Sequence, residues 1–440
     1  MRGIAAVTAL LFLTSAAAAE DAEDADKLVL VVAGDIAWPD GWGGIEHIDK
    51  QKEKLFELVQ PILDSGDLKF ANLECPFTDT KSVLKKTYPI TCQPKRLAYA
   101  VDAGFNLLSL ANNHSLDAGL QGIIDTNALV EKTNSDERPL WWGGIGETKE
   151  QANKTVFFTP PGKNAKVAFI ALANSGGASA HVGSFNSPEL GERIEAAAGQ
   201  ADIVIVSVHY GPEYIHVPSK NTVDRYHKLI DAGATVVISH HAHVVQGVEA
   251  YNNGFIFYNL GNFSFGSRTR RHLETGARMY SMMGRVVFEN NKISEVELLP
   301  LYANNSRAWC LGDEALDARH ATPQLLEGAF AQAAMDEFED FASQVPTDKP
   351  TRLYRVGDRM FAELHGKAPK LEDEALHLHE QLHEYQGCAT TGSVAREATP
   401  QEKQWANKAG TPLHYKPQPE KKQPKKKQRN RKQRNRKPGK

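Results

Sequence analysis

Short apolar runs alternate with longer amphipathic segments over residues 28–266 of this chain. Most of the runs are continuous rather than alternating in polarity, which is typical of strands covered on both faces. They lie at 28–33, 68–71, 107–110, 167–172, 203–208, 236–238 and 255–258. Helices are expected between them at 48–63, 119–132, 188–198 and 222–232. The alternation of strand and helix predicts a layered α/β domain.

The polarity pattern changes after this region. Runs at 286–288 and 296–299, separated by Asn290-Asn291-Lys292, predict a hairpin that closes the domain at about residue 300. Thr322-Pro323 then has the form of a helix N-cap and first turn. The apolar residues that follow at spacings of four and three are Leu326, Phe330, Ala334, Phe338 and Phe341. With a second helix expected at 371–385, they predict a helical extension over 310–390 that packs on the α/β domain of residues 28–300.

Residues 1–19 have the order of a cleavable secretory signal. Arg2 precedes an apolar stretch at 4–13, and Ala17-Ala18-Ala19 precede the acidic Glu20, so cleavage is expected after Ala19. The stretch is short for a membrane span, and no other segment is long and apolar enough to cross a bilayer. The mature protein is therefore predicted to be exported (periplasmic, cell-envelope or extracellular), without a transmembrane span.

The chain of 440 residues has four cysteines, which suits an oxidising compartment. Proximity alone favours Cys75 with Cys92 and Cys310 with Cys388, and free buried thiols are an equal alternative for the second pair.

The C-terminus differs from the rest in charge. Residues 421–440 hold twelve Lys or Arg and no acid, so a chain of net charge −3 carries −15 on residues 1–420. A tail so basic and free of apolar residues cannot fold alone, and we expect disorder over 400–440. Behind a signal peptide, anionic envelope polymers or lipid headgroups at a membrane surface are better partners for it than nucleic acid. A merely solvating tail is the open alternative.

Polar clusters follow five of the predicted strands. Three of the sixteen histidines fall within residues 239–243, directly after the run at 236–238. The other clusters are Asp35 after 28–33, Asn72-Leu73-Glu74, Asn112-Asn113-His114 and His209-Tyr210-Gly211. Ligands collect at the carboxyl ends of strands in α/β sheets. Carboxylates, an amide and imidazoles together favour one or two divalent ions such as Mn, Fe or Zn, although one such cluster alone would indicate little.

These clusters resemble, in order and spacing, the motifs of CapA-like proteins, the capsule or poly-γ-glutamate synthesis branch of the calcineurin-like metallophosphoesterase superfamily. The segments that carry the resemblance are Gly34-Asp35, Asn72-Leu73-Glu74, Ala111-Asn112-Asn113-His114 with Asp117 and Gly119, His209 to Tyr214, His240 to Gln246 and Tyr258 to Phe263. The resemblance implies a four-layer αββα metallophosphoesterase-like sandwich with a metal site at one edge.

The resemblance also implies roles for individual residues. Metal ligands would be Asp35, Glu74, Asn113, His209, His241 and His243, with Glu74 placed to bridge two ions. Catalytic residues would be His114, as the acid that protonates a leaving group, and Asp117, which orients it. Substrate-binding residues would be Asn112, Glu213, His240, Gln246 and Asn262, His240 either bordering the pocket or hydrogen-bonding behind the ligands.

Two departures from the superfamily pattern concern catalysis. The Asp-x-His of the first motif has Ala37 at the histidine position, and the bridging acid comes from Asn-Leu-Glu rather than from Gly-Asp-x-x-Asp. The favoured function is an exported metal-dependent hydrolase of a phosphoester or related bond in envelope-polymer biosynthesis. The alternative is a non-catalytic factor that binds, assembles or retains an anionic polymer.

A competing motif lies near the C-terminus. The segment His379-Glu380-Gln381-Leu382-His383 matches the His-Glu-x-x-His signature of zinc peptidases on a predicted helix. No third ligand follows it convincingly, which makes a peptidase a minor alternative.

Overall fold

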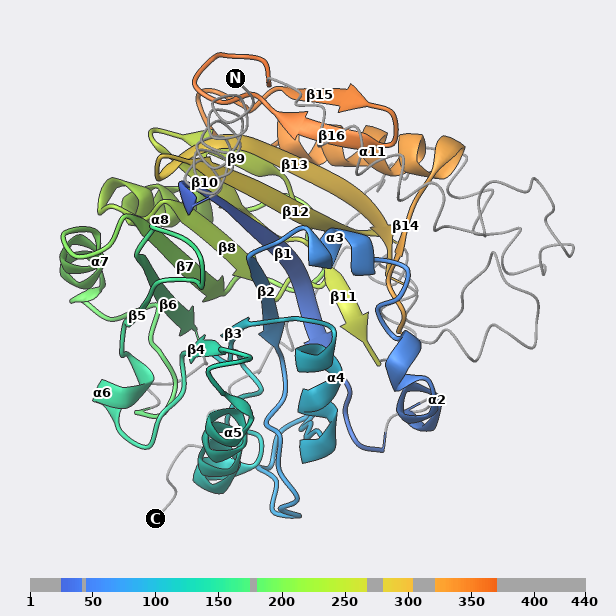
Figure 1. Cartoon of the computed structure of the whole chain (residues 1–440), viewed down its shortest axis with the longest axis vertical. Helices are drawn as coiled ribbons and strands as arrows, with labels where there is room; N and C mark the ends of the chain where they lie inside the picture. The colour runs from blue at the N-terminus through green and yellow to red at the C-terminus, as the bar shows by residue number, and fades with distance from the viewer. Residues whose placement is uncertain (1–24, 42–44, 175–179, 267–279, 304–320, 370–440) are drawn as a thin grey trace, which may run out of the picture.

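The computed structural model describes residues 25–41, 45–174, 180–266, 280–303 and 321–369, which form two β-sheets and the helices around them (Figure 1). The larger sheet has the strand order β15-β16-β13-β12-β1-β2-β3-β4, with β11 beside β1 and β14 beside β13. Its strands are β1 (Lys27–Ala37), β2 (Leu68–Leu73), β3 (Leu107–Ser109), β4 (Trp141–Gly143), β11 (Asn262–Phe265), β12 (Tyr280–Glu289), β13 (Lys292–Tyr302), β14 (Gln324–Leu325), β15 (Leu353–Val356) and β16 (Arg359–Ala362). The smaller sheet has the order β5-β6-β7-β8-β10-β9. Its strands are β5 (Val156–Phe158), β6 (Val167–Ala173), β7 (Ile203–His209), β8 (Val236–His240), β9 (Val248–Tyr251) and β10 (Gly254–Phe257).

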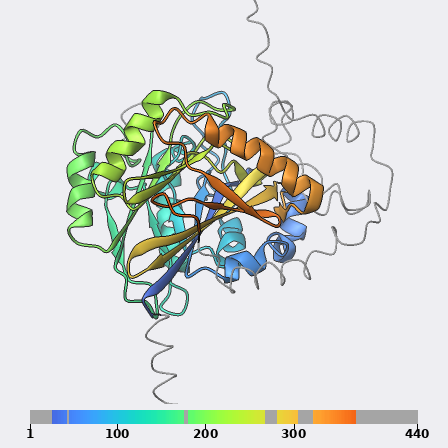
Figure 2. The ribbon, with the colours of Figure 1, turned by 90° about the horizontal axis from the view of Figure 1, so that it is seen from above.

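The two sheets pack face to face, and helices cover their outer faces. The helices are α2 (Ile45–Lys50), α3 (Gln60–Asp64), α4 (Leu97–Asp102), α5 (Gly119–Thr133), α6 (Lys149–Ala152), α7 (Leu190–Ala198), α8 (Lys220–Asp231) and α11 (Gly328–Ser343), with 3-10 turns η1 (Lys52–Lys54) and η2 (Pro94–Arg96). One apolar core joins side chains of both sheets, such as Val32 and Phe70 with Phe169 and Phe257. Figure 2 shows α7 and α8 on one side and the N-terminal helices on the other. The predicted α/β sandwich is therefore confirmed.

Most of the predicted elements are confirmed. Each of the seven apolar runs forms a strand of the expected position, and the runs at 286–288 and 296–299 lie in the antiparallel pair β12–β13. The helices expected at 119–132, 188–198 and 222–232 correspond to α5, α7 and α8. The single helix expected at 48–63 is wrong, because the chain forms three short pieces there: α2, η1 and α3. Pro61 explains where α3 begins, since proline is favoured in a first turn and cannot continue a preceding one.

The region expected as a helical extension is helical only in part. Within residues 321–369, α11 is the predicted helix, but it begins after Glu327, and Thr322-Pro323 precede the short strand β14 instead of capping it. The strand β16 pairs with β13, and β15 pairs with β16, so both strands enlarge the main sheet. Periodicity indicated the helix correctly, whereas the pairing of two four-residue strands depends on partners distant in sequence.

The C-terminal elements are fixed to the smaller sheet by polar contacts as well. The buried carboxylate of Glu249 in β9 accepts hydrogen bonds from Thr347, His227 Nε2 (2.9 Å) and the Tyr258 hydroxyl (2.6 Å). The backbone N–H of Ala250 donates to the Thr351 hydroxyl at 2.7 Å. Helix α11 lies across one end of the sandwich (Figure 2) and contributes Met335 and Phe338 to the core between the sheets. It is thus part of the sandwich.

The Cys75–Cys92 pairing is confirmed, with the two Cα atoms 6.0 Å apart. Cys310, Cys388, the helix expected at 371–385 and the His379 to His383 motif lie outside the described residues, as do the signal segment 1–19 and the tail 400–440. Among the helices that the structure describes, none has the length and apolar character needed to cross a bilayer.

Removing this disulfide should lower the free energy of unfolding by about 3 kcal/mol, because it closes a short loop in the unfolded chain. The cysteines are 17 residues apart in sequence and both are buried. Chemical denaturation of the double variant Cys75→Ala/Cys92→Ala, measured beside oxidised wild type, tests the estimate. If the free energy of unfolding fell by less than about 0.5 kcal/mol, the disulfide would not contribute to stability as expected.

Candidate metal centre

The predicted ligand residues meet where strands of both sheets end. Asp35 lies on β1 of the larger sheet, and Glu74 follows β2 directly. His209 is the last residue of β7 in the smaller sheet, and His241 and His243 lie just beyond β8. The site is therefore assembled from both layers at one edge of the sandwich.

Two groups of side chains could each hold an ion, and Glu74 belongs to both. One consists of Glu74, His209 and His241, and the other of Asp35, Glu74 and His243, with the ligand atoms of each group within 4.8 Å of one another. Asn113, the sixth predicted ligand, lies with its Oδ1 atom 3.0 Å from His209 Nε2. The structure thus brings all six residues together. A carboxylate shared by both groups would hold two ions close together, as in two-metal sites.

The state of Glu74 indicates that a cation fits here. The side chain is fully buried, and neither carboxylate oxygen has a hydrogen-bond partner among the described residues. Its Oε1 atom is 3.6 Å from His209 Nε2 and 3.8 Å from both His243 Nε2 and His114 Nε2, beyond hydrogen-bonding distance. Burial, and then the charges of Asp35 and Glu213, raise the pKa of Glu74 well above its ordinary value. A divalent cation would supply the positive partner that this carboxylate lacks.

Asp35 is held in the ionised form that a ligand needs. Burial alone raises the pKa of Asp35, but hydrogen bonding and the charge of His240, followed by His243 and Asn72, lower it below the ordinary value. Asn72 Nδ2 donates to Asp35 Oδ1 at 2.8 Å, and His240 Nδ1 lies 3.2 Å from the same oxygen. The carboxylate is therefore oriented from two sides.

His209 and His241 are neutral at ordinary pH. Burial and then the neighbouring imidazoles lower the pKa of His209 well below its ordinary value, and burial with the charge of His243 lowers the pKa of His241 to about 4. Neutral imidazole is the form that binds metal ions.

Unusual backbone conformations direct the two histidines into the site. His241 and His243 have φ angles of 95° and 58°, in the left-handed region that residues with a Cβ rarely adopt. The adjacent strands also approach closely: the Asp35 N–H donates to the Gly261 carbonyl at 3.0 Å, and a Cβ at Gly34 would lie 2.0 Å from that oxygen. Gly34 is needed for this approach.

Three of the residues expected to bind substrate are buried in the structure, and they contact the ligand residues or the segments that carry them. His240 is fully buried and stacks on Phe70 with ring centroids 5.4 Å apart, so of its two expected roles the structure favours orienting Asp35. Asn262 Oδ1 lies 2.9 Å from His243 Nδ1, and Asn112 Nδ2 donates to the Leu73 carbonyl at 2.8 Å. Both asparagines are buried and support ligand-bearing segments.

The two other residues expected to bind substrate, Gln246 and Glu213, lie beside the loop after β7 and on it. Gln246 is buried, and its Nε2 donates to the Ile215 carbonyl at 2.6 Å, which ties the loop of residues 241–247 to the loop after β7. Glu213 on this second loop is half-buried, and its charge reaches Glu74. It stays the one predicted substrate residue with an accessible side chain.

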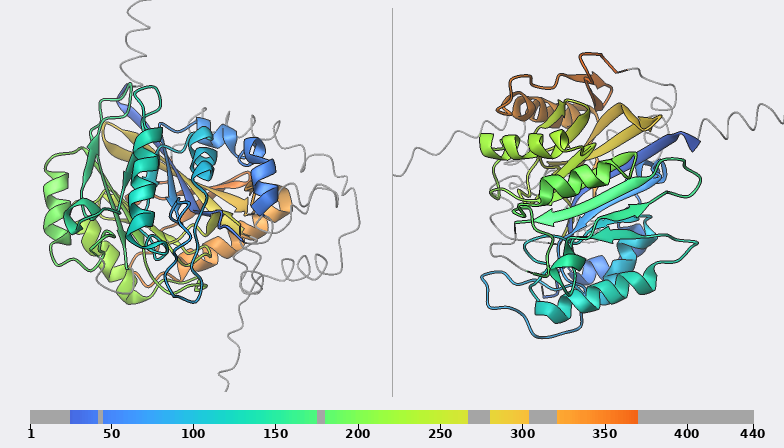
Figure 3. Two further views of the ribbon diagram at one scale, coloured as in Figure 1. Left: turned by 90° about the horizontal axis from the view of Figure 1, so that it is seen from below. Right: turned by 90° about the vertical axis from the view of Figure 1, so that its left-hand side faces the viewer.

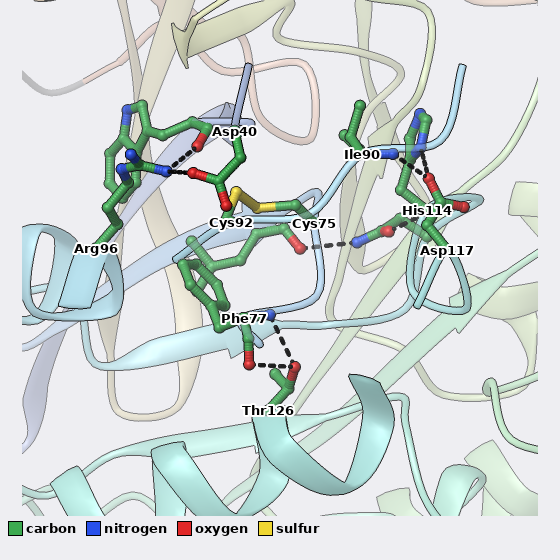
Figure 4. Close-up of a disulfide and its surroundings, with 12 residues drawn as sticks. Asp40, Cys75, Phe77, Ile90, Cys92, Arg96, His114, Asp117 and Thr126 are labelled. Carbon is green, nitrogen blue, oxygen red and sulfur yellow. Dashed lines mark hydrogen bonds and ion pairs between the residues drawn. A yellow bond between two sulfur atoms is a disulfide. The ribbon is translucent and has the colours of Figure 1, made fainter. Parts of the chain in front are cut away.

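His114 and Asp117 form the predicted pair. His114 Nδ1 lies 2.7 Å from Asp117 Oδ2 (Figure 4). The other ring nitrogen, Nε2, is 3.8 Å from Glu74 Oε1. The same carboxylate accepts the backbone N–H of Ile90 at 2.7 Å and pairs with Lys86 Nζ at 2.5 Å. Sequence reasoning missed Lys86, which comes from a loop without any motif. It also left Asn72 without a role, although that residue lies inside a quoted motif.

Ala37, at the position where the superfamily carries histidine, is buried on β1 and has no ligating atom. The Asp35 group therefore has three protein ligands, of which His243 is the only imidazole.

Comparison with known proteins identifies the family. Residues 29–267 match the family described as bacterial capsule synthesis protein PGA_cap. The chain is 28% identical over 302 residues to the capsule biosynthesis protein CapA of Bacillus anthracis, covering 66% of this chain and 70% of that protein. It is 30% identical over 254 residues to the PGA biosynthesis protein CapA of Bacillus subtilis (strain 168), covering 54% of this chain and 64% of that protein. A probable polyglutamine synthesis accessory protein of Mycobacterium tuberculosis is 26% identical over 173 residues, 36% of this chain and 44% of that protein.

The fold and the site define a protein of the layered α/β class with a candidate metal centre between two sheets. The family match covers more than half of the chain, and this protein belongs to the bacterial capsule synthesis family PGA_cap.

Proposed function

We propose that this protein is an exported, metal-dependent hydrolase that acts on a phosphoester or related bond during the biosynthesis of a capsule or poly-γ-glutamate-type envelope polymer. The observation that carries the proposal is the buried carboxylate of Glu74, shared by two groups of potential ligands and without a hydrogen-bond partner among the described residues. Export rests on the signal pattern of residues 1–19 and the polymer on the family.

Different side chains would bind the metal ions and donate the proton. Asp35, Glu74, Asn113, His209, His241 and His243 would hold one or two ions, with Mn, Fe or Zn favoured by this mixture of oxygen and nitrogen donors. Bound ions supply Lewis-acid stabilisation of the charge that develops on the substrate. Asp117 holds His114 Nδ1, so that Nε2 can give a proton to a leaving group on the side of Glu74.

The wild-type protein should hydrolyse p-nitrophenyl phosphate or bis(p-nitrophenyl) phosphate with added Mn²⁺ or Zn²⁺, and His241→Ala should reduce kcat/KM by about 100-fold or more. His365→Ala is the matched control, because His365 is exposed and also has a positive φ, of 52°. Steady-state measurement of kcat/KM for the wild type, His241→Ala and His365→Ala tests this prediction. Activity that His241→Ala leaves intact would contradict the assignment.

A second candidate is a non-catalytic factor that binds or retains an anionic polymer. It is favoured by Ala37, which leaves the Asp35 group one ligand short of the superfamily pattern. Wild-type protein that binds metal stoichiometrically yet hydrolyses neither ester would support this second function.

A further inference from the structure

The loop of residues 79–88 lies against the candidate centre. The loop projects beside α5 (Figure 3). In the sequence it lies between Cys75 and Cys92, which are joined by the disulfide. The Leu84 N–H donates to the Asp117 carbonyl at 2.7 Å. Lys86 Nζ donates to the Asn113 carbonyl at 3.0 Å and pairs with the Asp117 carboxylate at 2.5 Å. The loop is thus fixed to the residues that flank the centre.

The outward side chains of this loop combine positive charge with apolar surface. Residues 81–88 are exposed throughout. Val83, Leu84 and Tyr88 have 47%, 48% and 69% of their surface exposed, which is unusual for large apolar side chains. Lys81 and Lys85 have no ion-pair partner among the described residues.

The charge of the loop contrasts with the rest of the protein. Lys81, Lys85 and Lys86 against the single acid Asp79 make it basic, whereas residues 1–420 carry −15. Lys86 is held by Asp117, so it serves as the anchor, and the two other lysines are the free cations. Positive charge concentrated beside a reactive site attracts anionic ligands to it.

We propose that residues 79–88 form a polymer-binding subsite that holds an anionic chain beside the metal centre, with Lys81 and Lys85 contacting its charges. The alternation of lysines with Val83, Leu84 and Tyr88 fits a chain of carboxylates carried on short aliphatic units, because such a chain presents charge and apolar surface together. The identity of the polymer rests on the proposed function, whereas the subsite requires only binding.

The test is binding of fluorescently labelled poly-γ-glutamate to the full chain, followed by anisotropy at increasing salt. Lys81→Gln/Lys85→Gln should weaken binding about tenfold at low salt and make it less sensitive to salt. Lys81→Arg/Lys85→Arg should restore binding. The matched control Lys154→Gln/Lys228→Gln, which neutralises two exposed lysines elsewhere, should bind as the wild type does.

Three results would overturn the proposal. Binding unchanged in the Lys81/Lys85 double variant would show that the loop is not the subsite, even if neutralising the basic residues 421–440 abolished binding. An equal loss in the control pair would show that only total charge matters. Polyphosphate that binds as tightly as poly-γ-glutamate, with the same dependence on these lysines, would exclude the carboxylate chain as the preferred occupant. Because no arm measures hydrolysis, the subsite can be confirmed even where the proposed hydrolase activity fails.

Discussion

The Glu74→Gln variant is expected to lose metal binding at both ligand groups, because both depend on the carboxylate of this one residue. Elemental analysis of the purified protein should show one or two equivalents of a divalent metal in the wild type and a small fraction of that in the variant. Added metal at 100 times its dissociation constant should stabilise the wild type by about 2.7 kcal/mol and leave the variant nearly unaffected.

The same substitution should not weaken the metal-free protein. The pKa of Glu74 is raised above its ordinary value of 4.5 in the folded state, so the carboxyl group costs stability at any pH where the unfolded chain is ionised. Glutamine removes that cost. At pH 7 the metal-free variant should melt at or above the temperature of the metal-free wild type, and the difference should shrink as the pH falls toward 4.5.

Neighbouring acids serve as controls for this prediction. Glu213→Gln removes a nearby charge that belongs to neither group, so full metal content is expected. Asp35→Asn affects one group and should remove a single ion from a two-ion site. Retention of full metal content by Glu74→Gln would show that the two groups are not the metal site.

The Phe338→Ala variant should lose about 3–5 kcal/mol of unfolding free energy, because the side chain is almost completely buried between the two sheets. The expectation follows from the position of α11 as part of the sandwich rather than as an appended helix. Chemical denaturation with a single cooperative transition measures the loss.

Phe330→Ala provides the comparison on the same helix. That ring is 42% exposed, so the change should cost about 0.5 kcal/mol or less. Equal small losses in both variants, or a separate early transition for α11, would contradict the placement of this helix in the common core.

Continuous apolar runs predicted the strands well because strands buried on both faces cannot be polar. The N-terminal stretch 48–63 was harder, since its apolar residues Leu55, Phe56 and Val59 are buried but lie in turns between short helices. The spacing of apolar residues indicates which side chains are buried, but it does not show where one helix ends and a turn begins. The strands β15 and β16 were missed because four residues carry little periodicity. Their stability comes from pairing with each other and from the pairing of β16 with β13.

The sequence predicted which residues form the site, but it did not predict the contacts that hold them in place. Strand ends and motif order indicated all six residues that meet in the structure. The sequence could not show that Asn112, His240 and Asn262 are buried, because their polar side chains suit a substrate contact and a structural hydrogen bond equally well. Lys86 was undetectable because its contact with Asp117 depends on how the loop of residues 79–88 folds back.

The ligand residues come from both sheets, Asp35 and Glu74 from the larger and His209, His241 and His243 from the smaller. A cation bound there would act as a cross-link between the two layers, in addition to the apolar contacts between them. Metal uptake and the closing of the sandwich at this edge would then be one linked equilibrium. The edge that carries the centre would then be less stable wherever the ion is absent, while the apolar core would still hold the rest of the two layers together.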